Sequence, residues 1–196
     1  MPSDGGGRDA ILDTSAKLFS QHGYKEVSIR DIAQACGLTN AALYYHFKNK
    51  EDLFLAMLRR DHEKTLAALR EAAHGPGDLR EDLKQLVACY AAIGCERRQS
   101  FQTLRRDLSN VEDVRGHKLF AEMRSSVLRP LEERLAQAQA DGEIQSGDVR
   151  FYARLLHSMI IALTHEGRPD KPRKASAQEV AAAVDVFLNG VVTSGK

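Results

Sequence analysis

Residues 28–50 concentrate side chains that can hydrogen-bond to flat polar edges and to anions. Arg30, Thr39 and Asn40 carry groups that can pair with the edges of bases in the major groove of DNA. The two alanines after Asn40 are small enough to let a helix approach such a groove closely. Tyrosines, a histidine and two lysines follow directly, and hydroxyls and cations of this kind bind phosphate oxygens. The chemistry that this stretch could perform is recognition of double-stranded DNA.

Each candidate for DNA contact also has a simpler structural interpretation. Thr39 and Asn40 could be helix caps, Tyr44 could be a core aromatic residue, and the lysines could simply be solvated. The joint placement of these residues on one face of a tight two-helix unit favours the DNA interpretation. The full set of candidates is Ser28, Arg30, Thr39, Asn40, Ala41, Tyr44, Tyr45, His46, Lys48 and Lys50.

The elements that must position these side chains are short helices. Apolar residues recur with helical spacing over about residues 8–21, and Gly23 ends that helix. Ser28, with an acidic residue three positions later, begins a second helix that Gly37 ends. A third helix covers about residues 40–46 and is too short to be stable alone. Two helices joined by a tight turn and backed by a third form a helix-turn-helix.

The third helix needs support from apolar neighbours. Leu43 and Phe47 lie four residues apart and should both be buried, while Leu38 should pack back into the core. Asn49 caps a long fourth helix, which we expect to end near residues 74–77, where glycine and proline cluster. The fourth helix therefore connects the helix-turn-helix to the rest of the chain.

No strand pattern follows residue 78, and every later apolar stripe has helical spacing. We expect an all-α fold of about nine helices, with a disordered arm at residues 1–7. Proline at position 130 should kink the long helix expected there, rather than leave it uninterrupted. The later helices are expected at about residues 78–97, 101–108, 113–140, 149–165 and 176–191.

Composition and charge limit the class of protein. The 196 residues are 43% hydrophobic and carry a net charge of +1, so a DNA interpretation must rest on where the charges lie. No apolar run is long enough to span a membrane, and residues 1–10 lack the apolar centre of a signal peptide. The three cysteines are scattered and form no disulfide framework, which fits buried thiols in a reducing cytoplasm better than a redox switch. We expect a cytoplasmic protein.

Motifs for catalysis or metal binding are missing from the sequence. It contains no HExxH or GxSxG motif, and its Gly5-Gly6-Gly7 run follows no strand and is not a nucleotide motif. His157 and His165 could share one helix face, but two histidines do not make a closed zinc site. We therefore expect no enzyme activity, no cofactor and no metal.

Residues 8–54 resemble the DNA-binding domain of the TetR family of bacterial transcriptional repressors. The run LYYHFKNK at residues 43–50 carries the resemblance most specifically. The resemblance implies that Ser28 stands at a phosphate-binding position, as do Tyr44, His46 and Lys50. It also implies that Arg30, Thr39, Asn40 and Ala41 stand at positions that face bases. The sequence departs from the family at Ala41 and at Ala42, where a hydroxyl residue is frequent, so base readout should depend more on Asn40 and Arg30.

The resemblance also implies a C-terminal domain that binds a ligand and forms a homodimer through the last two helices. The implied division is a DNA-binding domain at residues 8–48 and a ligand-binding and dimerisation domain at residues 49–196. Most residues of the implied pocket could equally be core, and the apolar stripes of the last two helices could pack within one subunit. The candidate ligand-binding residues are Leu66, Tyr90, Phe101, Leu104, Arg105, His117, Phe120, Met123 and His157.

These observations together predict a ligand-responsive DNA-binding transcriptional regulator. The expected form is a repressor that a small apolar or amphipathic effector releases from a pseudo-palindromic operator. We expect the effector to act by moving the fourth helix, which changes the spacing of the two DNA-reading heads. The alternative is a helical, dimeric protein-interaction module that does not bind DNA. The dependence of DNA affinity on salt separates the two hypotheses.

Overall fold

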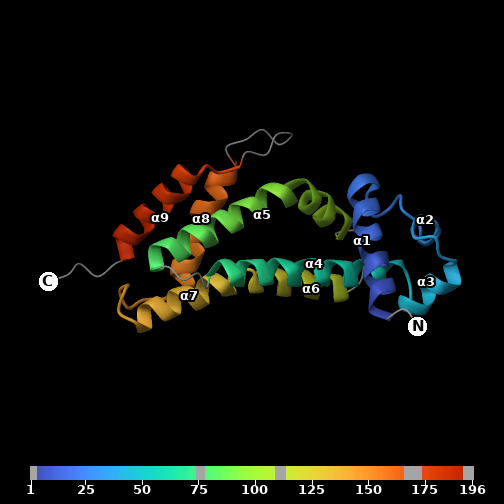
Figure 1. The fold of residues 1–196 in the computed structure, drawn as a ribbon, viewed down its shortest axis with the longest axis horizontal. Coiled ribbons are helices and arrows are strands. Elements are labelled where there is room, and N and C mark those ends of the chain that lie inside the picture. The colour runs from blue at the N-terminus through green and yellow to red at the C-terminus, as the bar shows by residue number, and fades with distance from the viewer. Residues whose placement is uncertain (1–3, 74–77, 109–113, 166–173, 192–196) are drawn as a thin grey trace. The chain divides into compact units, whose positions relative to one another are not determined.

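The structure is a computed structural model that describes residues 4–73, 78–108, 114–165 and 174–191. It describes side chains over residues 7–73, 78–94, 116–164 and 174–190. This part of the chain is helical, without strands, as the sequence predicts (Figure 1). Its helices are α1 (Asp4–His22), α2 (Ile29–Ala35), α3 (Asn40–His46), α4 (Lys50–Ala73), α5 (Leu79–Leu108), α6 (Val114–Ser126), α7 (Arg129–Ala140), α8 (Val149–His165) and α9 (Ala177–Val191).

The chain forms two compact units. Residues 1–63 and 99–122 make up the first unit, and residues 64–98 and 123–196 make up the second. The first unit therefore contains the whole predicted helix-turn-helix together with the beginning of α4. Because their residues fall on both sides of these boundaries, α4, α5 and α6 each contribute to both units.

An apolar core joins α1, α2, α3 and the beginning of α4 in the first unit. The ring of Phe54 meets that of Phe19 edge to face at 5.2 Å between centroids, and it lies 4.5 Å from the ring of Tyr24. Aromatic contacts of this geometry add to the hydrophobic gain from burial. The buried apolar residues of this unit include Ile11, Leu12, Phe19, Val27, Ile32, Ala33, Leu43, Phe47, Leu53, Phe54, Leu55, Met57 and Leu58.

Local capping fixes where α2, α3 and α4 begin. Ser28 and Asp31 form a reciprocal capping box at the start of α2, and Thr39 caps α3. At the start of α4, the side chain of Asn49 accepts a hydrogen bond from the N–H of Asp52 at 2.8 Å. Gly37 has φ of +66°, a left-handed conformation that side chains rarely adopt, so it provides the turn between α2 and α3. These features agree with the predictions from the sequence.

A second core joins α5, α7, α8 and α9 with the last part of α4. Arg134 of α7 donates from Nε to the buried carboxylate of Asp82 on α5 at 2.7 Å, and Arg80 of α5 pairs with Asp185 of α9. The core residues are Leu69, Ala73, Leu79, Leu83, Leu86, Val87, Tyr90, Ala91, Leu131, Leu135, Ala138, Ile144, Ala153, Leu156, Ile160, Val180, Val184, Phe187 and Leu188.

The predicted boundaries of two helices were wrong. The helix α5 runs without interruption to Leu108, where the sequence predicted two helices, because no glycine or proline separates Arg97 from Phe101. The long helix predicted over residues 113–140 is divided into α6 and α7 rather than kinked. Pro130 lies in the first turn of α7, where a missing N–H costs no hydrogen bond.

Two smaller predictions were also wrong. The helix α1 begins at Asp4, so residues 4–7 of the predicted arm are helical, because extending an existing helix gains a hydrogen bond for each residue fixed. Residues 1–3 lie outside the described part of the chain. Leu38 does not pack into the core: 37% of its surface is exposed, although its N–H donates to the carbonyl oxygen of Ala33 at 2.8 Å. That hydrogen bond closes the turn without burying the side chain.

Candidate nucleic-acid interface

The helix α3 has one buried face and one exposed face. Leu43 is fully buried and anchors the helix, while Tyr44 and Tyr45 are 52% and 76% exposed. Asn40 and Ala41 are exposed in the first turn. The interpretation of Tyr44 as a core residue is therefore wrong. The exposed face combines an amide, a small side chain and two phenols, which is the composition that close approach to a polar groove requires.

Thr39 has a structural role at the start of α3. Its Oγ1 accepts a hydrogen bond from the backbone N–H of Ala42 at 3.1 Å, which satisfies a donor that the helix itself leaves free. The predicted cap is confirmed, and the predicted base contact of Thr39 stays a prediction. Because Thr39 is exposed, its side chain is accessible from solvent while it caps the helix.

Ser28 is also engaged at a helix start. Its hydroxyl donates to Oδ2 of Asp31 at 2.6 Å, and its backbone N–H donates to the same oxygen at 2.8 Å. These hydrogen bonds hold the pKa of the Asp31 carboxyl below its ordinary value, so the carboxylate is charged at neutral pH. To bind a phosphate, the Ser28 hydroxyl would have to give up its bond to Asp31. Arg30, on the same helix, is exposed.

The two candidate lysines differ in their surroundings. Lys48 is exposed, and its backbone N–H donates to the carboxylate of Asp52 at 3.0 Å. Lys50 is half-buried: its ammonium lies 4.3 Å from the centre of the Tyr24 ring and donates to the carbonyl oxygen of Lys25 at 3.4 Å. Lys50 therefore holds the connection between α1 and α2, in addition to any contact with phosphate.

Arg8, which no sequence pattern singled out, lies beside the end of α3. Its guanidinium carbon is 5.0 Å from the centre of the Phe47 ring. A methyl group added at Gly7 would lie 4.0 Å from Nε2 of His46, so the first turns of α1 approach the same place. Arg8 is exposed and adds a cation at this edge of the helix-turn-helix. No local pattern could reveal it, because the contact joins residues far apart in the sequence.

All ten candidates for DNA contact lie in the first unit. Eight of them are exposed, and His46 and Lys50 are half-buried. The structure thus gathers exposed hydrogen-bonding and basic groups on α2, α3 and the segment that follows α3. This arrangement supplies groups for bases and groups for phosphates within one small unit.

The structure brings together only some of the candidate ligand-binding residues. The rings of Tyr90 and His157 meet edge to face at 5.8 Å, and Leu66 and Met123 belong to the same second unit. His117 and Phe120 belong to the first unit, with His117 exposed. The remaining candidates are Phe101, Leu104 and Arg105, whose side chains lie outside the described part of the structure.

Tyr90, which is buried, and His157, which is half-buried, lie in contact within the second unit. The Tyr90 hydroxyl donates to the carbonyl oxygen of Val127, between α6 and α7, at 2.5 Å. Burial raises the pKa of Tyr90 far above its ordinary value, and burial lowers the pKa of His157. Both side chains are therefore neutral at pH 7, so this pair suits a neutral hydrogen-bonding group rather than a charged one.

Within residues 4–73, 78–108, 114–165 and 174–191, no helix has the length and apolar character to cross a membrane. In the same part of the chain, no cluster of three or more His, Cys, Asp or Glu side chains could hold a metal ion.

Known proteins with similar sequences identify the family of this chain. The family model described as bacterial regulatory proteins, tetR family, matches residues 11–57, which include every candidate for DNA contact. The HTH-type transcriptional repressor ComR of Escherichia coli (strain K12) is 30% identical over 173 residues, covering 82% of this chain and 79% of ComR. This chain belongs to the TetR family. It is therefore a DNA-binding transcriptional regulator.

Solved structures of TetR-family proteins share this fold. A TetR-family transcriptional regulator from Mesorhizobium loti MAFF303099 superposes with a TM-score of 0.82 at 19% identity, covering 98% of this chain and 100% of that one. PfmR from Thermus thermophilus is 29% identical with a TM-score of 0.65, covering 91% of this chain and 97% of PfmR. The likeness of fold thus extends beyond the helix-turn-helix to nearly the whole chain.

Proposed function

We propose that this TetR-family member is a homodimeric repressor that a small apolar or amphipathic effector releases from a pseudo-palindromic operator. The observation that carries the DNA-binding part is the exposed face of α3. Leu43 anchors that helix while Asn40, Tyr44 and Tyr45 remain open to a partner. We expect the protein to act in the cytoplasm, without a cofactor or a metal.

DNA contacts divide into two groups in this proposal. Arg30, Thr39 and Asn40 read base edges, with Ala41 allowing close approach. The remaining contacts position the protein on the backbone and carry no direct sequence information. The phosphate contacts are Ser28, Tyr44, Tyr45, His46, Lys48 and Lys50. Residues 8–48 form the DNA-binding domain, and residues 49–196 bind the effector and form the dimer.

An experiment on DNA binding tests this proposal first. A duplex selected from a random library with the wild-type protein would serve as the operator, and a scrambled duplex of equal composition as the control. We expect the protein to prefer the selected duplex, with an affinity that falls linearly on a logarithmic salt scale. A failure to enrich any sequence would contradict the proposal.

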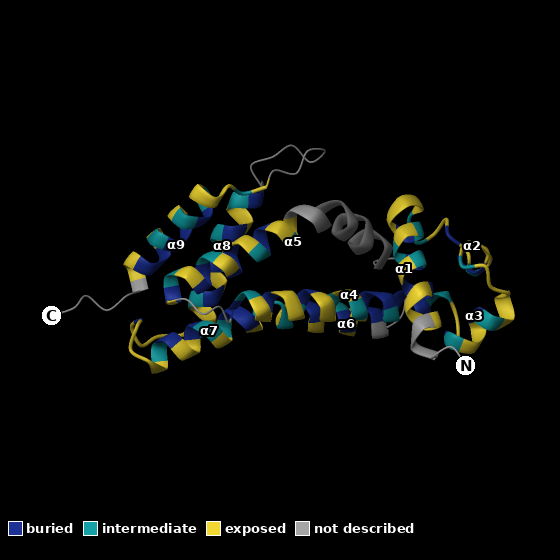
Figure 2. Cartoon of the chain, viewed as in Figure 1, coloured by how far each residue is buried: buried dark blue, intermediate teal, exposed yellow. Residues whose placement is uncertain are grey.

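The dimer is proposed to form through exposed apolar residues of α8 and α9. Exposed residues lie along both α8 and α9 (Figure 2). Phe151 and Leu155 of α8 lie one helical turn apart and are half exposed, and Val186 of α9 is 67% exposed. Large apolar side chains exposed on adjacent helices mark interaction surfaces. A two-fold dimer places two recognition helices roughly 34–36 Å apart, which matches one turn of DNA.

A pair of variants tests the dimer surface. Val186→Asp introduces a charge at its centre, and Gln178→Asp introduces the same charge at an exposed polar position of α9. We expect sedimentation to show monomers for Val186→Asp and dimers for Gln178→Asp. Dimers of Val186→Asp at micromolar concentration would place the interface elsewhere.

The effector is proposed to bind in the second unit, near Tyr90 and His157. An elongated apolar molecule with one polar or acidic end fits the predicted lining of apolar residues with few polar groups. Because Tyr90 and His157 are neutral, they would meet a neutral polar end, and an acidic end would have to meet a basic group elsewhere in the lining. Because α4 contributes residues to both units, effector binding can act on the DNA-binding domain through this helix. The effector must bind the released state more tightly than the DNA-bound state, or nothing shifts.

A panel of small molecules tests the effector class. Fatty acids, acyl-CoAs and aromatic acids would be titrated against the protein bound to a fluorescent selected duplex. Release by at least one of them supports the proposal. Tighter binding of DNA would identify a co-repressor instead, and no response to any of these compounds would reject this class of effector.

A further inference from the structure

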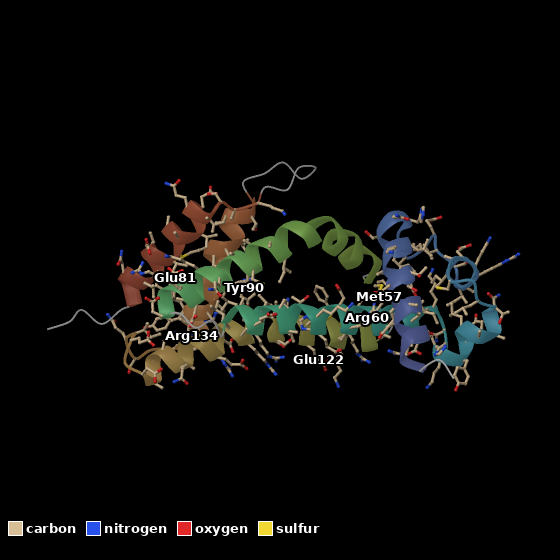
Figure 3. All side chains as sticks on the ribbon, viewed as in Figure 1. Met57, Arg60, Glu81, Tyr90, Glu122 and Arg134 are labelled. Atoms are coloured by element: carbon tan, nitrogen blue, oxygen red, sulfur yellow. The ribbon has the colours of Figure 1, made fainter. Side chains whose placement is uncertain are left out.

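Arg60 of α4 makes contacts that the DNA-binding proposal does not use. Its Nη1 donates to the backbone carbonyl oxygen of Asp9 at 2.9 Å and to Oδ1 of the same residue at 3.2 Å. Its Nη2 donates to the carboxylate of Asp13. Figure 3 shows Arg60 on α4, near Met57 and beside α1. One guanidinium therefore holds two carboxylates and a backbone carbonyl group of α1.

The arrangement around Arg60 is specific rather than a chance surface contact. Its side chain is only 18% exposed, while those of Asp9 and Asp13 are 63% and 58% exposed. Asp9 and Asp13 lie four residues apart, on one face of α1, where two carboxylates repel each other. The guanidinium relieves this repulsion. Its Nε is buried without a hydrogen-bond partner among the described residues, so withdrawing Arg60 from water has a cost.

The helix α1 and the turn that follows it contact the first part of α4 at several points. Arg60 holds the beginning of α1, Phe54 packs on Phe19 towards its end, and Lys50 lies over the ring of Tyr24 just beyond it. These contacts lie in order along α4 and in reverse order along α1. Figure 1 shows α1 crossing the first part of α4, and these contacts hold it there.

The same helix also touches the end of α3. Arg8, next to Asp9, places its guanidinium over the ring of Phe47, the residue that ends α3. The first turns of α1 thus contact α4 through Arg60 and the DNA-reading helix through Arg8. A shift of α1 on α4 would change the orientation of α3.

We propose that Arg60 is a positioning residue for DNA recognition, which holds α1 on α4 through Asp9 and Asp13 and so sets the orientation of α3. This inference rests on the proposed reading of DNA by α3. Arg60 itself does not contact the DNA. Its loss should weaken binding to the operator, where alignment matters, more than binding to unrelated DNA, where phosphate charge dominates.

Three variants and one matched control test the role of Arg60. Arg60→Gln removes the clamp, Arg60→Lys keeps the charge but not the forked geometry, and Asp13→Asn removes one exposed carboxylate with little risk to folding. Arg59→Gln removes the same charge from the neighbouring exposed position. Each variant would first be checked for wild-type helicity and a cooperative melt, and affinities for selected and scrambled duplexes would be measured at several salt concentrations.

We expect Arg60→Gln to bind the selected duplex about tenfold more weakly, with smaller losses for Arg60→Lys and Asp13→Asn. Binding to the scrambled duplex, the slope of affinity against salt and the behaviour of Arg59→Gln should all match the wild type. If Arg60→Gln does not fold, the affinities of Arg60→Lys and Asp13→Asn for the selected and scrambled duplexes test the proposal in its place.

Two results would overturn the role of Arg60. An equal loss on both duplexes with a shallower salt slope would make Arg60 a phosphate contact, and unchanged affinity in every folded variant would make the clamp irrelevant to recognition. If the wild type bound both duplexes equally, the proposed function itself would fail. The wild-type measurement therefore separates failure of the function from failure of this inference.

Discussion

The DNA-reading surface and the interior of the second unit place their polar side chains in opposite surroundings. On α3, Asn40 and Tyr45 point to solvent while Leu43 anchors the helix. In the second unit, Tyr90 is buried and His157 half-buried, and the Tyr90 hydroxyl already donates to the carbonyl oxygen of Val127. An exposed polar group can meet a partner without altering the fold. A buried polar group must have a hydrogen-bond partner within the folded protein.

This difference separates recognition from stability in the two regions. Substituting an exposed residue of α3 should change DNA binding and leave folding almost untouched. Substituting Tyr90 or His157 should change stability first, so a part in effector binding is visible only after stability is controlled. The following variants test that separation, from the largest expected effect to the smallest.

The first prediction compares alanine substitutions of a buried aromatic residue, Phe47, and an exposed one, Tyr45, in the same segment. Phe47 is 1% exposed, so Phe47→Ala should lower the free energy of unfolding by about 3–5 kcal/mol. Tyr45→Ala should change it by less than about 0.5 kcal/mol, although it weakens DNA binding. Urea denaturation measures both. Equal losses of stability would contradict the division between the two faces.

Tyr90→Phe removes one hydroxyl from the interior of the second unit. The carbonyl oxygen of Val127 then loses its donor, which should lower the free energy of unfolding by about 1–3 kcal/mol. Tyr44→Phe removes the same atom from an exposed ring and should leave stability unchanged. Thermal melts of the two variants provide the measurement. A stable Tyr90→Phe protein would mean that water replaces the lost donor.

Asn40→Ala tests base recognition on the exposed side. We expect a loss of about 1–3 kcal/mol in affinity for the selected duplex, with relaxed preference at one position in each half-site. Stability should match the wild type because Asn40 is exposed in the first turn of α3. Repeating the library selection with the variant reports the preference. If affinity fell equally for every sequence, Asn40 would contact the DNA backbone rather than a base.

The pH dependence of stability tests the surroundings of His157 in the second unit. Burial lowers the pKa of His157 in the folded state, so below the ordinary histidine pKa the unfolded chain binds the extra proton more readily. The contribution of His157 is therefore complete above that ordinary value and is lost as pH falls from it towards the lowered one. His157→Phe should flatten this part of the profile of melting temperature against pH. A profile unchanged by His157→Phe would reject the assignment.

Substitutions of the two candidate lysines should have the smallest effects on DNA binding and stability. Lys48 is exposed, so Lys48→Ala should reduce the slope of log affinity against log salt by about 0.9, with no change in melting temperature. Lys50→Ala should also lower the melting temperature, because its ammonium packs on Tyr24. Fluorescence anisotropy at several salt concentrations gives both slopes. Identical melting temperatures would show that the Tyr24 contact contributes nothing to stability.

Sequence patterns revealed those parts of the structure that local chemistry determines. The caps at Ser28, Thr39 and Asn49, the turn at Gly37 and the burial of Leu43 all depend on residues within a few positions of each other. They could be predicted because capping and helical spacing act over one or two turns.

Contacts between distant residues could not be predicted in the same way. Arg60 meets Asp9 across 51 positions and Tyr90 meets Val127 across 37, and neither contact leaves a local pattern. The division between α6 and α7 was also missed. Pro130 fits the first turn of a new helix as well as a kink in an old one, and tertiary packing decides between them.

The affinity of the wild-type protein for selected and scrambled duplexes, measured across a range of salt, tests most directly whether the exposed face of α3 reads DNA sequence. We predict that the selected duplex binds at least about a thousandfold more tightly at physiological salt. Both affinities should fall linearly on logarithmic axes as salt rises. Equal affinity for the two duplexes, or an affinity independent of salt, would contradict the account.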